Sequence, residues 1–347
     1  MTTAPAKTSL RRAALMTLLL AGGLGLTALA ALAWGRYQIP LTTMRELASL
    51  KLSQADIPPE LTRPATVLFN IRLPRILLAF LVGGALSVSG AAYQSLFRNP
   101  MVAPDILGVS SGAGVGASLA IVWGWPTAAL HLTAFLFGLG AVAIVLTVTR
   151  AVGRGGSLVV LILVGVVVSS LFSAVGSFIK YLNTDDQSLA VIVLWLMGSL
   201  AKAGAWINLP IMLGVTVLGI LPLFLTRWQI NTLAFGEEEA RAMGVDVRRL
   251  RLIIVISATL LTASAVALCG LIGWVGLIIP HLARFLVGPN FRDLLPVTFL
   301  GGGLFMLLVD SVVRLALPGE MPVGIVTSVV GAPLFIYILC RSRKEWT

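Results

Sequence analysis

The charged segment from Phe235 to Arg251 holds the densest group of residues in this sequence that could do chemistry. Three glutamates and four arginines fall within it, namely Glu237, Glu238, Glu239, Arg241, Arg248, Arg249 and Arg251. Charged side chains at this density must lie in water, where they can hold a partner of opposite charge in register. The segment therefore predicts either a docking site for a soluble partner or a merely solvated loop.

Two short helices separated by a glycine are expected within this segment. The glutamates follow Gly236, and carboxylates are favoured at the positive end of a helix dipole. Gly244 can adopt the left-handed conformation that ends a helix. Asp246 can cap the next short helix, which carries the arginines. Such a pair of helices is a compact handle that a partner could push.

Few other residues offer reactive chemistry. His131 and His281 have no second ligand nearby, so no metal site is expected. Cys269 and Cys340 lie in apolar runs and are expected to be small buried hydrophobes. The P-loop pattern Gly-x-x-x-x-Gly-Lys-Ser/Thr does not occur, so ATP is not expected to bind this chain. The sequence thus predicts no catalytic residue, no cofactor and no enzyme.

Composition identifies the kind of protein that carries this segment. Of 347 residues, 58% are hydrophobic and 11% are charged, and the mean hydropathy is +0.98. These values lie far outside the range of soluble domains. The net charge of +11 comes from basic residues between apolar runs, which argues against a nucleic-acid-binding face.

Ten apolar runs approach the roughly 20 residues that a helix needs to cross a membrane. They cover residues 13–34, 76–96, 106–124, 127–149, 157–180, 206–226, 252–271, 273–288, 294–313 and 322–340. A shorter run at 189–200 is expected to lie at the surface or to dip partway into the membrane. The predicted fold is an all-α polytopic membrane protein with about ten transmembrane helices in one domain, residues 1–347.

The distribution of basic residues predicts the topology. If residues 1–12 are cytoplasmic, most of the 25 Lys and Arg residues lie on the cytoplasmic side, as the positive-inside rule requires. Residues 227–251 then form cytoplasmic coupling helices. An even number of spans returns the carboxyl terminus to the cytoplasm. The alternative for the first run is a cleaved secretory signal, although the run is longer than a typical signal core.

Residues 35–75 form the longest polar segment, which lies outside in this topology. Pro40, Pro58, Pro59 and Pro64 are expected to prevent one continuous helix there. The segment nevertheless carries six basic residues, which are Arg36, Arg45, Lys51, Arg63, Arg72 and Arg75. Either the outer loop simply tolerates these charges, or they form a docking surface for an acidic partner.

Several motifs between about residues 70 and 340 occur in a characteristic order. They are Arg72-Leu-Pro-Arg75, Gln94 to Pro100, Ala103 to Gly112, Gly236-Glu-Glu-Glu-Ala-Arg241, Gly276 to His281, Asp310-Ser-Val-Val-Arg314, Pro322-Val-Gly324 and Gly331-Ala-Pro333. With them the chain resembles the FecCD family, the permease subunits of bacterial ABC importers for ferric siderophores, haem and vitamin B12. The resemblance implies a type II importer permease that forms a homodimer or pairs with a homologue. Two cytoplasmic ATPase subunits would bind ATP, and an outer substrate-binding protein would deliver the substrate.

The resemblance also implies roles for individual residues. Those expected to couple to the ATPase are Glu237, Glu238, Glu239, Arg241, Gly244 and Arg248. Those expected to form gates are Asn99, Met101 and Ser157. The fifth span would follow the pathway, where Ser169, Ser173 and Ser177 are four residues apart and share a helix face. These serines could instead bond to carbonyls one turn back.

Three arginines would meet acidic side chains of the binding protein, namely Arg72, Arg75 and Arg314. Pro74 suits a first helical turn, so Arg72 and Arg75 are expected to point outward together. Arginine fits this task because its planar fork can engage a carboxylate through two hydrogen bonds. Asp310, four residues before Arg314, predicts a pair within one helix.

Small residues predict one close helix contact. Gly108, Gly112 and Gly116 recur every four residues and are expected to line one face, where two backbones approach closely. A substrate-contact role is the alternative for this face. Ser110 and Ser111 beside them could bond across helices or line a polar path.

The predicted function is an ABC importer permease that moves an iron complex, haem or a ferric siderophore, across the bacterial inner membrane. Vitamin B12 is the alternative substrate. An ion-coupled secondary transporter is the alternative from another class, but it would need ionisable residues in mid-span, and the predicted span centres hold almost none. A membrane enzyme would need paired acids or a histidine cluster, and neither occurs.

Overall fold

The computed structural model describes residues 4–35, 37–152, 158–201, 206–316 and 321–342, and these form helices joined by turns. Each of the ten predicted runs is a helix, which confirms the all-α fold. They are α1 (Ala4–Ala33), α4 (Leu73–Leu96), α5 (Val109–Val122), α6 (Thr127–Val152), α7 (Leu158–Leu182), α9 (Asn208–Leu225), α12 (Val247–Cys269), α13 (Val275–Val287), α14 (Phe291–Ala316) and α15 (Val323–Ser342). The shorter elements are α2 (Leu41–Leu52), η1 (Pro59–Leu61), α3 (Thr62–Ala65), η2 (Thr66–Arg72), α8 (Asp186–Leu196), α10 (Arg227–Thr232), η3 (Leu233–Phe235) and α11 (Glu237–Ala242).

Seven helical stretches in the described part of the chain are long and apolar enough to cross a membrane. Helices α5, α8 and α13 are apolar but shorter than the roughly 20 residues of a full span. Helix α8 corresponds to the short run at 189–200. It packs against α5 and begins where the Asp185 side chain accepts hydrogen bonds from the amides of Gln187 and Ser188.

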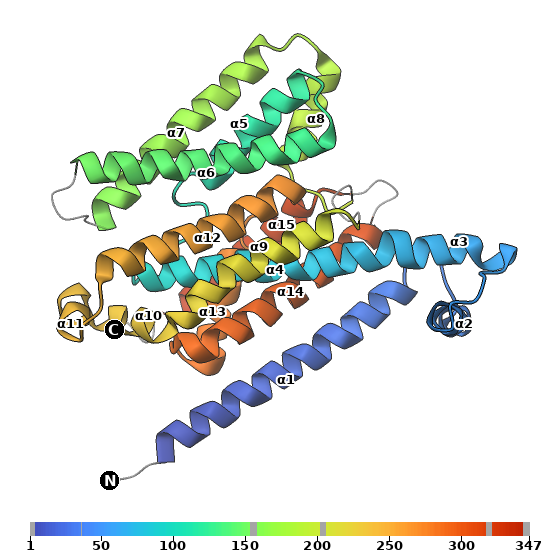
Figure 1. Ribbon diagram of the computed structural model, residues 1–347, viewed down its shortest axis with the longest axis horizontal. Coiled ribbons are helices and arrows are strands. Elements are labelled where there is room, and N and C mark those ends of the chain that lie inside the picture. The colour runs from blue at the N-terminus through green and yellow to red at the C-terminus, as the bar shows by residue number, and fades with distance from the viewer. Residues whose placement is uncertain (1–3, 36, 153–157, 202–205, 317–320, 343–347) are drawn as a thin grey trace.

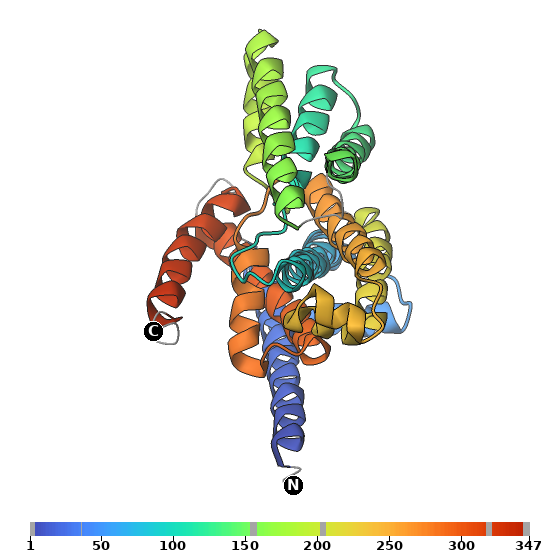
Figure 2. The same ribbon diagram turned by 90° about the vertical axis from the view of Figure 1, so that its left-hand side faces the viewer.

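Helix α4 lies at the centre of the molecule, packed against α12, α13 and α14 (Figures 1 and 2). A Cβ added to Gly90 would lie 1.7 Å from the carbonyl oxygen of Gly276, so only glycine allows α4 and α13 to approach this closely. Ser89 on α4 donates a hydrogen bond to the carbonyl of Ala258 on α12, at 2.9 Å. In lipid, where helices gain little from hydrophobic burial, such close packing and hydrogen bonding hold them together.

Helices α5, α6 and α7 form a second layer beside this core (Figure 1). Gly112 and Gly116 both face α6, since an added Cβ would lie 2.5 Å from the carbonyl oxygens of Phe137 and Thr133 respectively. The packing prediction is therefore confirmed for these two glycines. It is wrong for Gly108, which precedes α5 with φ +82° and faces α7 instead.

Residues 59–96 form one continuous helical rod, because η1, α3 and η2 run directly into α4. The prediction that prolines interrupt residues 35–75 holds for Pro40 and Pro58, which lie at the starts of α2 and η1. It is wrong for Pro64, which lies within the rod. Helix α2 packs beside the rod through the fully buried Leu47, in a small core with Leu68.

The two ends of the helix bundle differ. The start of α1, the end of α15 and the short helix α11 all lie at one end, called here the α11 end (Figure 1). Helices α2 and α3 lie at the opposite end, called here the α2 end. This arrangement agrees with an even number of crossings between the two termini.

Candidate functional site

The charged segment 235–251 connects α9 to α12 at the α11 end. Gly244 follows α11 with φ +83°, the left-handed conformation that was predicted. Asp246 accepts a hydrogen bond from the amide of Arg249 at 3.0 Å and caps the next helix, also as predicted. That helix is the long α12, so the prediction of a second short helix is wrong. No helix-breaking residue separates these arginines from the apolar run that follows.

Glu237 is bound within this segment. Its carboxylate lies 2.5 Å from Nη2 of Arg251 on α12 and 3.2 Å from Nη2 of Arg241 on α11. Arg251 is largely buried in this pair, whereas Arg241 is exposed. Glu237 therefore joins α11 to α12 and is not a free carboxylate for a partner.

The rest of α11 presents a mixed surface to its surroundings. Glu238 and Glu239 are exposed, as is Arg248 in the first turn of α12. Two apolar side chains lie beside them, with Phe235 71% and Met243 44% exposed. Exposed apolar groups amid charges are typical of a surface that binds another protein. The predicted coupling residues thus divide into an exposed set and the internal Glu237.

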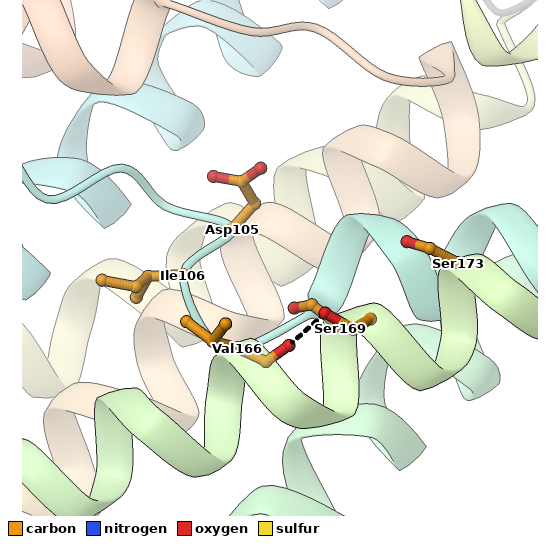
Figure 3. A pocket seen from close by; sticks show the side chains of 6 residues that line it. Asp105, Ile106, Val166, Ser169 and Ser173 are labelled. Atoms are coloured by element: carbon orange, nitrogen blue, oxygen red, sulfur yellow. Dashed lines mark hydrogen bonds between the residues drawn. The ribbon is translucent and has the colours of Figure 1, made fainter.

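A cavity of about 470 Å³ opens beside the middle of α7 (Figure 3). It is lined by Asp105, Ile106, Val166, Ser169, Ser170 and Ser173. The structure thus brings two of the predicted pathway serines, Ser169 and Ser173, to one cavity, whereas Ser177 is not among its lining residues. Ser173 donates a hydrogen bond to the hydroxyl of Ser111 on α5 at 3.4 Å, and Ser170 bonds back to the carbonyl of Val166 at 2.9 Å.

Asp105 is a residue of this cavity that the sequence analysis missed. It belongs to the loop between α4 and α5, and its side chain is exposed. Two glycines fix this loop against α7. A Cβ on Gly108 would lie 2.9 Å from Oγ of Ser169, and one on Gly165 would lie 2.7 Å from the carbonyl oxygen of Ile106. The amide of Gly108 also donates to the carbonyl of Asp105 at 2.8 Å.

The sequence did contain a signal for Asp105. It is an acidic residue directly before an apolar run, inside the motif Ala103 to Gly112. Ionisable residues within apolar segments mark functional sites by default. In the sequence, however, Asp105 also stands just before a predicted helix, where a carboxylate is favoured by the helix dipole. The sequence therefore gives no reason to place it in a cavity.

A second, more enclosed cavity of about 110 Å³ lies on the other side of the same loop and also includes Asp105. Its polar side chains are Asp105, Ser110 and Thr262, and Trp274 and Pro104 are among its apolar ones. The volume is large enough for water, and polar groups are present to bind it. Ser110, which was predicted either to bond across helices or to line a polar path, lines this cavity.

The predicted gate residues lie at the other end of the loop. Asn99 and Met101 follow the end of α4 at the α11 end, and both are exposed. The Asn99 side chain accepts a hydrogen bond from the amide of Met101 at 2.9 Å, which joins the two in one turn. Neither lines the cavity beside α7. Ser157, the third predicted gate residue, lies outside the described residues.

Arg72 and Arg75 do not point outward together, and that prediction is wrong. Nε of Arg75 donates to Oδ1 of Asp310 at 2.8 Å, and both side chains are buried. Arg72 is also buried. Its guanidinium donates to the carbonyls of Leu32 and Ala33 at the end of α1, the latter at 3.2 Å, and to that of Tyr37 just beyond it. The negative end of the α1 dipole favours this cation.

Arg314 completes this group at the α2 end. Its Nε lies 3.1 Å from Oδ2 of Asp310, which confirms the predicted pair within α14. It also donates to the carbonyl of Ala31 on α1, at 3.3 Å. The three arginines predicted to dock a partner are therefore occupied inside the protein, where they join α1, α4 and α14.

The remaining candidates are structural. His281 packs edge-on against the ring of Phe285, with centroids 5.0 Å apart. Within the described ranges, no three residues of His, Cys, Asp or Glu come together as metal ligands. Cys269 is buried as predicted, whereas Cys340 is exposed, so its predicted burial is wrong.

Comparison with known proteins identifies the family. The FecCD transport family matches residues 23–341. The molybdate import system permease protein MolB of Haemophilus influenzae is 41% identical over 92% of this chain and 93% of its own. The hemin transport system permease protein HmuU of Yersinia pestis is 40% identical over 80% of this chain and 84% of its own. A solved ABC transporter of the metal-chelate type, in an inward-facing conformation, has a TM-score of 0.84 and 39% identity, covering 94% of this chain and 98% of its own.

The residues that match the family model include those of the cavity beside α7, of the charged segment and of the arginine group. It agrees with the motifs in the sequence and with the helical architecture of the described residues. The chain therefore belongs to the FecCD transport family and is the membrane-spanning permease subunit of an ABC importer.

Proposed function

We propose that this permease imports an iron complex, haem or a ferric siderophore, across the bacterial cytoplasmic membrane. The observation that carries the proposal is the serine-lined cavity of about 470 Å³ in a chain that is 58% hydrophobic. Cavities of roughly 300–1,000 Å³ suit organic ligands of drug size, and a bare oxyanion needs much less room. The relatives bear the names of different substrates, molybdate and hemin among them. Vitamin B12 is the alternative substrate.

A second copy of the chain, or a homologous permease, is proposed to complete the pathway. Two of the α7 residues that line the cavity, Val166 and Ser170, are exposed. On α7 itself, Val167 is 68% and Leu171 60% exposed. A two-fold symmetric partner would cover this face and place two such cavities opposite each other.

The α11 end is proposed to be cytoplasmic, as the positive-inside rule requires. There the exposed surface of Phe235, Glu238, Glu239 and Met243 would dock one of two ATPase subunits, which bind the ATP. Closure of the ATPases would move α11, and α12 would move with it because Glu237 joins the two. Packed helices shift between discrete arrangements, so this motion can open or shut a constriction. Asn99 and Met101 are proposed to form it, with Ser157 as a second gate.

The α2 end is proposed to receive the substrate-binding protein. Arg45, Lys51 and Arg63 are exposed there. These three residues, and not Arg72, Arg75 and Arg314, are proposed to form the docking surface of the outer segment. The exposed acids Glu46, Asp56 and Glu60 lie among them. This mixed surface can orient a partner whose acids meet the three basic side chains.

Reconstitution tests the function. Purified permease, its ATPase and its binding protein are placed in vesicles, and uptake of a ferric siderophore, haem, cobalamin and molybdate is measured with and without ATP. ATP-dependent uptake of an iron complex is expected. Uptake of only molybdate or cobalamin would refute the iron assignment. Transport by the permease alone, driven by an ion gradient, would support a secondary transporter instead.

A control separates coupling from leakage. An ATPase variant that binds but does not hydrolyse ATP should abolish uptake while leaving the complex assembled. Uptake that persists with this variant would show a passive pore.

A further inference from the structure

Asp105 is the one charged side chain among the described residues that line the cavity beside α7. Figure 3 shows the Asp105 and Ile106 side chains coming from the loop, and those of Val166, Ser169 and Ser173 coming from α7. The loop cannot easily withdraw from α7, because Gly108 and Gly165 hold it at backbone contact distance. The backbone that carries Asp105 is therefore packed against α7 and is not a free loop.

No cation among the described residues neutralises Asp105. The ion pairs found in the described part of the chain are those of Glu237 and Asp310 with their arginines. The neighbours of Asp105 in the two cavities are serines, Thr262 and apolar groups. The carboxylate borders both cavities, so water can reach it from two sides.

A negatively charged group beside a transport pathway attracts cations that pass it and repels anions. Low-dielectric walls strengthen the field inside a cleft, raising the local concentration of ions of one sign and lowering that of the other. A symmetric pair of subunits would present this carboxylate twice.

We infer that Asp105 is a specificity-determining residue of the pathway, one that favours neutral or cationic substrates and disfavours anionic ones. This inference rests on the proposed function and narrows it. Ferric iron held by three singly charged ligand groups is neutral. Doubly charged ligand groups leave an anion, as do the two carboxylates of haem. The substrate class is therefore a ferric complex without net negative charge, in preference to haem or to an oxyanion such as molybdate.

Thiol chemistry tests the inference without knowledge of the substrate. Ser173→Cys is made in a Cys340→Ser background, in which the remaining Cys269 is buried. Two methanethiosulfonates with the same reactive group are compared near neutral pH, one carrying trimethylammonium and one carrying sulfonate. With Asp105 present, the cationic reagent should react faster. Asp105→Asn should lower the cation-to-anion rate ratio at least about threefold.

Two controls keep the test independent of folding. Asp56→Asn removes an exposed acid from the segment between α2 and η1 and should leave the ratio unchanged. Ser328→Cys lies in a separate cavity beside α15 whose described lining residues include no acid, so it should show a lower ratio than Cys at 173 even when Asp105 is intact. Equal ratios at the two cysteines, or a ratio at position 173 that Asp105→Asn does not change, would overturn the inference. Such a result would not contradict the proposed import of an iron complex, which the reconstitution experiment tests separately.

Discussion

Asp310 lies between two guanidinium groups at the α2 end, with Arg75 from α4 on one side and Arg314 from its own helix on the other. Its carboxylate is fully buried. A buried carboxylate is stable only when charged partners and hydrogen bonds replace the water it has lost. Arg314 and Arg72 also donate to carbonyls at the end of α1, a helix that buries little of its own surface. The group therefore fastens α1 to the core.

Asp310→Asn should destabilise the folded permease by about 3–5 kcal/mol, because it leaves the buried Arg75 and the partly buried Arg314 without the charge between them. The measurement is thermal unfolding in detergent. A triple variant that replaces Arg75, Asp310 and Arg314 with Met, Leu and Met should be more stable than Asp310→Asn, since no charge remains at these three positions and Arg72 keeps its backbone carbonyl partners. An unfolding temperature equal to wild type for Asp310→Asn would contradict the account.

At the scale of the helix, the proposed coupling surface depends on how α11 is attached to α12. The six residues of α11 are too few to be a stable helix on their own. Gly244 and Asp246 determine its end and the start of α12, and the ion pair of Glu237 with Arg251 holds the two helices together. A force on α11 can therefore reach α12, which packs against the central α4.

Glu237→Lys should uncouple ATP hydrolysis from uptake while the ATPase still co-purifies, because the exposed surface of α11 remains. Glu238→Lys and Glu239→Lys are matched controls in the same turn, and they should weaken ATPase binding instead. The exchange of Glu237→Arg with Arg251→Glu should restore much of the coupling. Two results together would contradict this account. The charge exchange would not restore coupling, and Glu237→Lys would weaken ATPase binding as Glu238→Lys and Glu239→Lys do.

The packing of α5 on α6 makes a separate prediction. Gly112→Leu should sharply lower the yield of folded protein, because the new side chain would overlap the backbone of Phe137. Gly140→Leu is the matched control on α6, where an added Cβ meets nothing within 4 Å, and its yield should stay near normal. Normal yield for Gly112→Leu with loss of uptake alone would mean that this face lines the pathway.

At the scale of the whole molecule, exposed charge is concentrated at opposite ends of an apolar bundle. Arg45, Lys51 and Arg63 lie at the α2 end, and the exposed glutamates of α11 lie at the other. Two soluble partners can therefore act on the permease from opposite sides of a membrane. Arg72, Arg75 and Arg314 instead join helices within the bundle.

Reversal of Arg45, Lys51 and Arg63 to Glu should weaken docking of the binding protein at low salt, and the difference should shrink at high salt. Exposed pairs contribute only about 0–1 kcal/mol each and are screened by ions, so the three together should change affinity by roughly tenfold. Arg248→Glu at the α11 end is the control and should leave docking unchanged. The affinity of the purified binding protein for reconstituted permease is measured for the triple variant and for Arg248→Glu. An unchanged affinity in the triple variant at low salt would exclude this surface.

The sequence alone predicted the ten helices, the left-handed Gly244, the cap by Asp246 and the family. The helices, the glycine conformation and the cap depend on residues close together in the chain, such as an apolar run of about 20 residues, a glycine after a helix or an acid before one. The family depends on the order of short motifs along the chain. Only the tertiary structure revealed the ion pair of Arg75 with Asp310, the attachment of Glu237 to Arg251 and the place of Asp105 in a cavity. Arg75 and Asp310 are 235 positions apart, and Glu237 and Arg251 are 14 apart. A side chain's exposure and partners depend on which helices pack around it, and local sequence does not specify that packing.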